Sequence, residues 1–213
     1  MDKDKNKYAE NKIKHLKLRK TTNQMGGGGD DKYIIKLDTY GDYLEFIKQK
    51  FDDKDLNLRF SQWIYDIIDG KPGPDSERLL YEGKDFVLVK TMDMNIEKDP
   101  DTFHLLAFPK DKSIRSIRDL TRKNIPLLKE MVEESKKFIT NKYRFNENEI
   151  EAHCHYPPGV LLLHIHFELT NIKRHRRPLR EHSVNNIIEN LSIDPEYYKK
   201  RTFEILLKIP SKK

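Results

Sequence analysis

The stretch "VLLLHIHFELT" (residues 160–170) constrains the fold of this chain more than any other feature. Successive side chains of a β-strand point to opposite faces of a sheet, so a strand here would carry two very different faces. One face is apolar and must cover a core: Leu161, Leu163, Ile165, Phe167 and Leu169. The other face holds Val160, Leu162, His164, His166 and Glu168, and we interpret it as a polar surface from which both histidines point the same way.

A second pair of histidines lies on the preceding candidate strand, "EIEAHCHY" (149–156), where His153 and His155 share one side. The two strands are joined through "PPG", and opposed residues of an antiparallel hairpin lie on the same face. We predict that 155 opposes 162 and that 153 opposes 164, which places all four histidines together. A slip of one residue would separate the two pairs.

Three kinds of site could use such a cluster: a zinc site, a phosphate site with a nucleophilic histidine, or a solvated histidine patch. The neighbouring segment "KRHRRPLR" (173–180) is strongly basic. Its cations suit a polyphosphate and would repel a metal ion. The sequence therefore favours the phosphate site and leaves the other two open.

The rest of the chain predicts an α+β fold, in which an antiparallel sheet packs with one long helix and several shorter ones. Apolar residues at helical spacing indicate helices near 40–51, with Tyr40, Tyr43, Leu44, Ile47 and Phe51 on one side, and 55–70, ending at Gly70. A long helix is expected over 116–143, capped by Asp119 or Thr121, and a shorter one over 182–191. Strands are expected at 78–82, 86–91, 102–109, 149–156, 160–170 and 201–209.

We expect residues 1–31 to be a flexible polar and basic tail, and 32–213 to be one domain. Within that domain, a helical lead-in would occupy about 40–70, and the sheet and long helix 78–208. The net charge of +6 is a mild preference for anionic partners, and the single Cys154 allows no intrachain disulfide. No segment approaches the roughly 20 apolar residues of a membrane span, so we expect a soluble protein of the cytoplasm or nucleus without a membrane partner.

Five segments in the same order resemble the scavenger mRNA decapping enzymes, a branch of the histidine triad (HIT) superfamily. They are "RFSQWIYDIID", "SERLLYE", "SIRSIRDLTRKNIPLL", "CHYPPGVLLLHIHFELT" and "IIENLSIDPEYYKKRTFEILLK". The resemblance implies a HIT-like sheet and hydrolysis of the triphosphate of N7-methylguanosine cap dinucleotides or short capped RNA. It also implies a homodimer that needs no metal or other cofactor.

The family's His-x-His-x-His motif can be carried over residue by residue. It implies that His164 is the nucleophile that attacks the phosphate attached to methylguanosine, and that His166 is the last histidine of the triad. The first histidine is missing, because its place is taken by Leu162. His155 matches a further family histidine near the phosphates.

Phosphate-binding and cap-binding residues follow from the same resemblance. Arg180 matches a phosphate-binding arginine, Arg177 is close to it in sequence, and Lys90 could replace a family lysine that has no clear equivalent. Trp63 matches the tryptophan that stacks on the positively charged methylguanine, although its apolar neighbours alone would favour a core residue. Asp75 stands where the family has a glutamate that accepts hydrogen bonds from the edge of the guanine base. Asp93 matches a family aspartate only if a small insertion is allowed.

Two other functions stay open: a HIT hydrolase of dinucleotide polyphosphates, and a cap-binding protein without turnover. The presence of Trp63 with a nearby acidic residue argues against the first function, since an uncharged purine does not need this pair for binding. Retention of His164 speaks against the second. Only about 39 residues precede the first matched helix, so we expect the family's large N-terminal lid domain to be absent.

Overall fold

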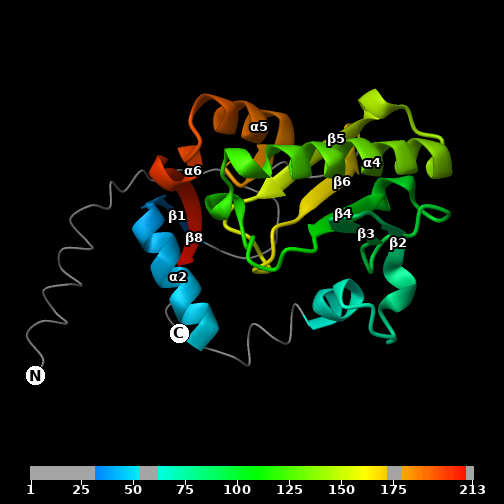
Figure 1. Cartoon of the computed structure of the whole chain (residues 1–213), viewed down its shortest axis with the longest axis horizontal. Coiled ribbons are helices and arrows are strands. Elements are labelled where there is room, and N and C mark those ends of the chain that lie inside the picture. Colours follow the sequence, from blue (N-terminus) through cyan, green and yellow to red (C-terminus); the bar gives the residue numbers. More distant parts are fainter. Residues whose placement is uncertain (1–31, 53–61, 172–178, 210–213) are drawn as a thin grey trace, which may run out of the picture.

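The structure, a computed structural model of the chain, describes residues 32–52, 62–171 and 179–209. Its centre is a six-stranded antiparallel sheet in the order β2-β3-β4-β6-β5-β7 (Figure 1). The strands are β2 (Leu79–Glu82), β3 (Phe86–Lys90), β4 (His104–Pro109), β5 (Ile150–His155), β6 (Ile165–Leu169) and β7 (Glu181–Ser183). The α+β architecture predicted from the sequence is therefore confirmed.

Both faces of this sheet are covered by helices. The long helix α4 (Ile125–Tyr143) and α5 (Val184–Ile193) cover the first face, where Leu128 and Met131 pack against sheet residues such as Phe167. All five residues of the predicted apolar face, from Leu161 to Leu169, belong to this core. Alternate residues of the same strands, such as Val87 and Phe108, face the other side.

The second face is covered by a short helical segment at residues 62–68, through Ile64 and Ile67. This segment ends at Gly70, which has φ +65° and a backbone N–H that donates to the Ile67 carbonyl. The next amide, of Lys71, donates to the Asp66 carbonyl, which completes a Schellman motif. The predicted stop at Gly70 is confirmed, whereas the start of the predicted helix falls in 53–61, outside the described residues.

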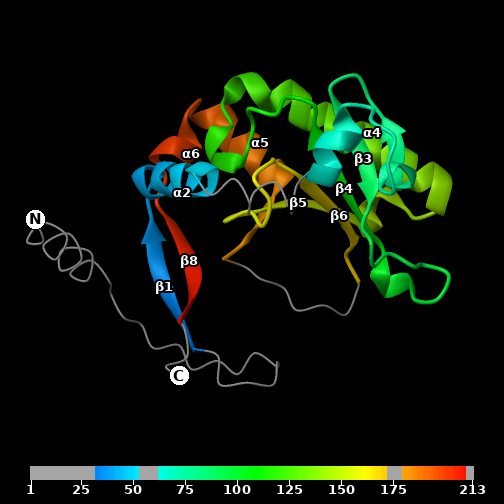
Figure 2. The same ribbon diagram turned by 90° about the horizontal axis from the view of Figure 1, so that it is seen from below.

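A separate two-stranded ribbon is formed by β1 (Lys32–Asp38) and β8 (Phe203–Ile209), and it projects from the body of the molecule in Figure 2. Helix α2 (Tyr40–Asp52) lies at the base of this ribbon, next to the short helix α6 (Tyr197–Lys200). The predicted helix at 40–51 is confirmed, but Leu44 is half exposed and does not share the buried face of Tyr43 and Ile47. The sequence analysis missed β1 as a strand, as well as the short β7.

Two predictions about the elements near the histidines were wrong in detail. The long helix begins at Ile125, not near 116, because two 3-10 turns at Ile117–Asp119 and Arg122–Asn124 precede it, each with a capping box. The strand expected at 160–170 begins only at Ile165, since 160–162 are bends and 163–164 are irregular, all without ladder hydrogen bonds. Consequently His153 opposes His166, and the register is two residues away from the one predicted.

Among the described residues, no helix combines the length and the apolar character that crossing a bilayer requires. Cys154 lies fully buried on β5, and burial raises the pKa of its thiol to about 12. The thiol is thus held in its neutral form.

Candidate active site

Five histidines gather on the second face of the sheet. A shift of two residues keeps the same side-chain parity, so the predicted clustering of His153, His155, His164 and His166 is confirmed despite the wrong register. The ring centroid of His166 lies 3.9 Å from that of His155, 4.8 Å from that of His164 and 5.1 Å from that of His153. A fifth ring, His104 of β4, lies 5.0 Å from His166 on its other side.

Three of the five histidines are buried and the other two are partly buried, contrary to the prediction of a polar surface. Exposed fractions are 1% for His153, 9% for His164 and 6% for His166. The sequence analysis did not foresee that residues 62–68 fold over this face, or that Leu162 turns inward to join Ile64 and Ile67 in an apolar cluster. Burial excludes most water, which strengthens electrostatic interactions within the cluster.

His164 has a fixed tautomer. Its Nδ1 lies 2.8 Å from the carbonyl oxygen of Leu162, which can only accept a hydrogen bond, so Nδ1 carries the proton. The other ring nitrogen, Nε2, then keeps its lone pair. Burial, and to a smaller extent the charge of Arg180, lowers the pKa of His164 and keeps the imidazole neutral. This is the form in which a histidine attacks an electrophile.

His166 is held from the opposite side. Its Nδ1 lies 2.8 Å from Nε2 of His104, so one proton is shared between these two nitrogens. Glu168, which is 6% exposed, has carboxylate oxygens 3.7 Å from His104 Nε2 and 3.9 Å from His153 Nε2. Burial first, and then repulsion by the surrounding histidines, holds the pKa of His166 well below its usual range.

Trp63 is half-buried beside a small pocket that Asp75 also lines, together with Asp66 and Lys71. The guanidinium carbon of Arg78 lies 3.6 Å from the centroid of the Trp63 ring. One nitrogen of that guanidinium is 3.1 Å from a carboxylate oxygen of Asp75. Arg78 therefore holds the indole and the carboxylate next to each other.

The indole and the histidine cluster are linked through Phe108. The Phe108 ring makes an edge contact with Trp63 at 5.9 Å between centroids, and its centroid lies 5.2 Å from that of His164. A ligand that reaches from Trp63 to His164 therefore has to extend past a single aromatic side chain.

The phosphate-binding candidates have different outcomes. Arg180 is near the cluster, since its charge acts on His164 and its guanidinium lies close to Gly159. Arg177 lies outside the described residues. Lys90 is at the end of β3, where its carbonyl accepts a hydrogen bond from Arg78 at 3.1 Å.

Asp93 stands apart from the other candidates. It is exposed in the turn that follows β3. Across the described ranges, no hydrogen bond or ion pair joins Asp93 to Trp63, to Asp75 or to the histidines.

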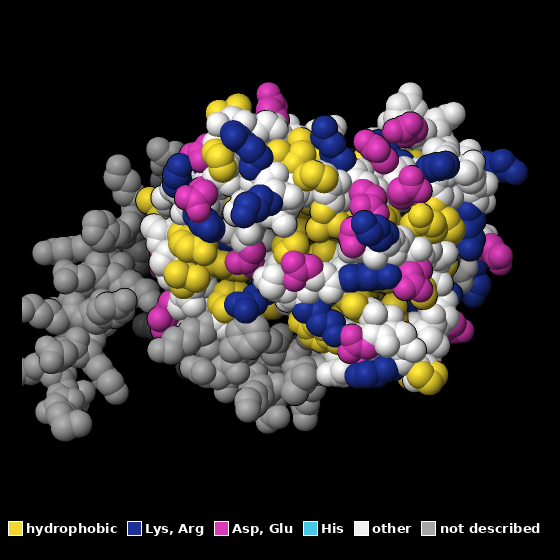
Figure 3. Space-filling view, in the orientation of Figure 1, with side chains coloured by type: hydrophobic (Ala, Val, Ile, Leu, Met, Phe, Trp, Pro, Cys, Tyr) yellow, Lys and Arg dark blue, Asp and Glu magenta, His cyan; other side chains and the backbone are white. Residues whose placement is uncertain are grey.

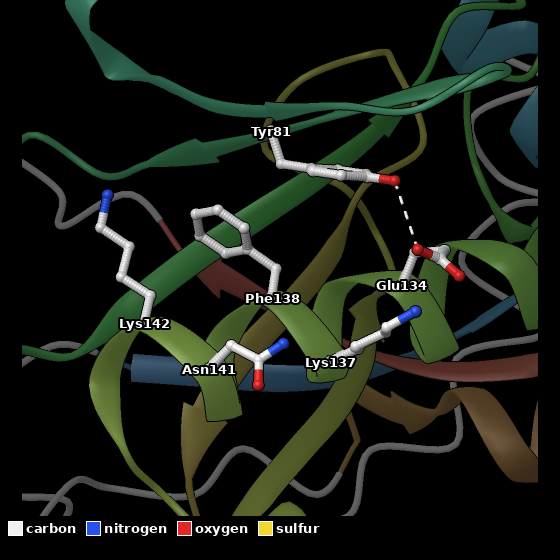
Figure 4. A pocket seen from close by; sticks show the side chains of 6 residues that line it. All are labelled: Tyr81, Glu134, Lys137, Phe138, Asn141 and Lys142. Atoms are coloured by element: carbon white, nitrogen blue, oxygen red, sulfur yellow. Dashed lines mark hydrogen bonds between the residues drawn. The ribbon is translucent and has the colours of Figure 1, made fainter.

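A hollow of about 430 Å³ lies elsewhere, between β2 and α4. Figure 4 shows its lining: Tyr81, Glu134, Lys137, Phe138, Asn141 and Lys142. Tyr81 and Glu134 are hydrogen-bonded across it at 3.3 Å. On the face shown in Figure 3, lysine, arginine and acidic side chains are interspersed and form no continuous basic track. Neither feature offers the nucleophile and fixed base that the histidine cluster offers.

Sequence reasoning missed three residues of this site: His104, Glu168 as a partner of the histidines, and Arg78. His104 is in the strand predicted at 102–109, and the pairing of His104 with Glu168 puts both on the histidine face. Only the strand order β4-β6, which the sequence does not give, reveals this. Arg78 carried no signal beyond its short distance in sequence from Asp75.

Comparisons with known proteins identify the family of this chain. The family described as "Scavenger mRNA decapping enzyme C-term binding" matches residues 62–176, more than half of the chain. The chain belongs to this family. The matched segment of this chain contains Trp63, Asp75 and all five clustered histidines.

Curated relatives carry the same sequence signal. The chain is 30% identical to the m7GpppX diphosphatase of Sus scrofa over 183 residues, which are 84% of this chain and 52% of the relative. It is 30% identical to the m7GpppX diphosphatase of Homo sapiens over 176 residues, 80% of this chain and 50% of the relative. The chain thus spans about half the length of the relatives it matches. Among solved structures, the aprataxin ortholog Hnt3 in complex with DNA overlaps 66% of this chain and 85% of its own, with 16% identity and a TM-score of 0.42.

Proposed function

We propose that this protein hydrolyses the triphosphate bridge of N7-methylguanosine caps, releases N7-methylguanosine monophosphate, and forms a covalent phosphohistidine at His164. The observation that carries the proposal is the 2.8 Å contact between His164 Nδ1 and the Leu162 carbonyl, which leaves Nε2 as a buried nucleophile. The activity for which the relatives are named, m7GpppX diphosphatase, supports the same reaction.

The reaction has two steps in this proposal. The lone pair of His164 Nε2 attacks the phosphorus attached to methylguanosine, and the bond from that phosphorus to the bridging oxygen breaks. The remaining diphosphate leaves with the electron pair of that bond. Water then attacks the phosphorus and releases a proton to the solvent, the bond between nitrogen and phosphorus breaks, and His164 Nε2 recovers its lone pair. No metal takes part in either step.

His166 and His155 donate hydrogen bonds to the phosphate oxygens as charge spreads over them. When His104 Nε2–H donates to His166 Nδ1, the proton of neutral His166 is on Nε2, which faces the cluster. Arg180 adds a positive charge on the side of His164. Donors and charges that are already in place reduce the reorganisation needed in the transition state.

The cap base stacks on Trp63 in the proposed complex, because methylation gives the guanine a positive charge that an indole face attracts. Asp75 accepts hydrogen bonds from the guanine edge, and Arg78 positions both residues. Phe108 contacts both Trp63 and His164, which supports neighbouring positions for the base and the reacting phosphate. We also propose that the protein acts as a homodimer in the cytoplasm or the nucleus.

The test is incubation with methylated cap dinucleotide in the presence of a chelator, with chromatography of the released monophosphate. We expect release by the wild type and a loss of more than about 1,000-fold in His164→Ala, as for removal of a catalytic nucleophile. His182→Phe is a matched control, because His182 packs against Phe203 away from the cluster and its replacement should leave turnover unchanged.

Two outcomes would replace the proposal with another function. Tight cap binding without release by the wild type would indicate a cap-binding protein, in keeping with the missing first histidine at Leu162. Equal turnover of methylated and unmethylated dinucleotides would indicate a general dinucleotide polyphosphate hydrolase, since only the methylated base is a cation for Trp63.

A further inference from the structure

We propose that His153, His155 and His166 form a binding site for one divalent transition-metal ion of the zinc type. One ring nitrogen from each of these histidines lies within 4.8 Å of the others. His153 belongs to the histidine cluster but has no part in the proposed hydrolysis, so the metal site is distinct from the set of residues that would carry out that reaction. Metal binding does not depend on the proposed function, whereas its effect on turnover does.

The strand geometry favours three imidazole ligands at this place. His153 and His155 are two residues apart on β5, and His166 is the direct partner of His153 on β6. Their ring centroids are 3.9 to 5.1 Å apart. Zinc bonds to imidazole nitrogen at about 2.0 to 2.1 Å in a tetrahedral arrangement. Small rotations of the side chains on fixed strands would bring the three nitrogens to that distance.

A second layer of residues orients these ligands. His104 Nε2 contacts His166 Nδ1 at 2.8 Å, and Nε2 of His166 is buried with no hydrogen-bond partner among the described residues. When His166 Nδ1–H donates to His104, Nε2 has a lone pair available for a metal. A ligating histidine usually gives its other N–H to an acceptor in this way, often with a carboxylate nearby, as Glu168 is here.

A competing set of ligands, His104, His166 and Glu168, also lies close together. An ion bound between His104 and His166 would have to break the hydrogen bond that already joins their facing nitrogens. The set that contains His153 and His155 keeps this bond. Arg180 adds a positive charge near His164, which lowers the affinity for a cation without removing a ligand.

The consequence for the enzyme follows from the shared residues. An ion on His155 and His166 occupies the nitrogens that contact phosphate oxygens in the proposed reaction. Bound metal therefore inhibits hydrolysis, and a chelator restores it. The position of one proton between His104 and His166 distinguishes the two states. With the proton on His104 Nε2, His166 Nε2–H donates to phosphate; with the proton on His166 Nδ1, His166 Nε2 binds the metal.

The experiment is titration of the tag-free, metal-free full chain with Co²⁺, followed by visible absorption and by metal analysis after dialysis, and then displacement by Zn²⁺. We expect one Co²⁺ per chain in the wild type. His153→Phe should weaken binding at least tenfold, because it removes a ligand, and the loss of a mere supporting residue already costs about 10–100-fold. The matched control His182→Phe should bind as the wild type does.

Stoichiometry well below one in the wild type, or equal affinity in His153→Phe and His182→Phe, would overturn the proposal. If His153→Phe does not fold by circular dichroism, His155→Asn takes its place with the same expected loss. Hydrolysis measured in chelator separates the two proposals: a wild type that binds Co²⁺ without hydrolysing caps disproves the proposed function alone. Inhibition by Zn²⁺ that is strong in the wild type and weak in His153→Phe supports the regulatory consequence.

Discussion

Leu162 shows how one residue can serve the site through its backbone. Its side chain is fully buried in the apolar cluster with Ile64 and Ile67, where a histidine would be an unsatisfied polar group. Its carbonyl nevertheless holds the proton of His164 Nδ1. The tautomer of the proposed nucleophile is therefore set without the first histidine of the family motif.

The charge state of His164 leads to a prediction about pH. Burial and Arg180 lower its pKa below the usual value of about 6.5, so His164 stays neutral, and able to attack, to more acidic pH than a solvated histidine. We expect kcat/KM for the cap dinucleotide to fall only as pH decreases through this lowered pKa. In Arg180→Gln, the pKa of His164 rises and the acidic limb of the profile should move to higher pH.

The measurement is kcat/KM against pH from 4 to 8 for the wild type and for Arg180→Gln. Loss of a phosphate contact alone would lower the whole curve without moving its acidic limb. A limb that stays in place would show that Arg180 does not tune the nucleophile.

At the scale of elements, six of the eight described strands were predictable because their signals are local. The alternation of side chains between the two faces of a strand identified the apolar face of 161–169, and Gly70 identified a helix end. Both signals depend only on neighbouring residues. The clustering of the histidines was also predictable, because a register shift of two residues leaves every side chain on the same face of the sheet. Three features required tertiary information: the burial of His153, His164 and His166, the strand order that adds His104, and the irregular backbone at 160–164 that shifts the register.

The connection between the ribbon and the body depends on Arg118, which is fully buried in the 3-10 turn Ile117–Asp119. Its guanidinium lies 3.1 Å from the carboxylate of Asp38 at the end of β1 and 3.0 Å from the hydroxyl of Tyr156 after β5. It also donates to the carbonyl of Tyr198, at 2.8 Å, shortly before β8. One side chain thus joins three segments that are far apart in the sequence.

Asp38→Asn should strongly destabilise the fold, because it leaves the Arg118 charge buried without its carboxylate. Breaking a buried ion pair in this way typically costs about 3–5 kcal/mol. Denaturant unfolding followed by circular dichroism gives the value. Glu82→Gln is the control, since its ion pair with Lys110 is solvent-exposed and should contribute little. Equal stability of the two variants would mean that Arg118 does not need the charge of Asp38.

At the scale of the whole molecule, the ribbon leaves apolar surface exposed. Leu37 is 50% and Leu206 43% exposed, and the pairing of Ile35 with Leu206 puts these two leucines on the same face of the ribbon. An isolated two-stranded ribbon is only marginally stable in water. A second copy of the chain that packs on this face would bury both leucines and stabilise the ribbon.

We therefore expect the wild type to sediment as a dimer at micromolar concentration, and Leu206→Lys to weaken the dimer at least tenfold. Burying one leucine contributes about 1.5–3 kcal/mol, and each 1.4 kcal/mol corresponds to about tenfold in affinity. Met92→Lys is the control, because Met92 is 78% exposed in the turn after β3 and not on the ribbon. If Leu206→Lys and Met92→Lys sediment alike, the dimer uses another surface, and a wild type that stays monomeric at tens of micromolar excludes this dimer.

Because His164, its acceptor carbonyl and Trp63 all come from the one chain, a monomeric variant that keeps its turnover would show that each subunit holds a complete site.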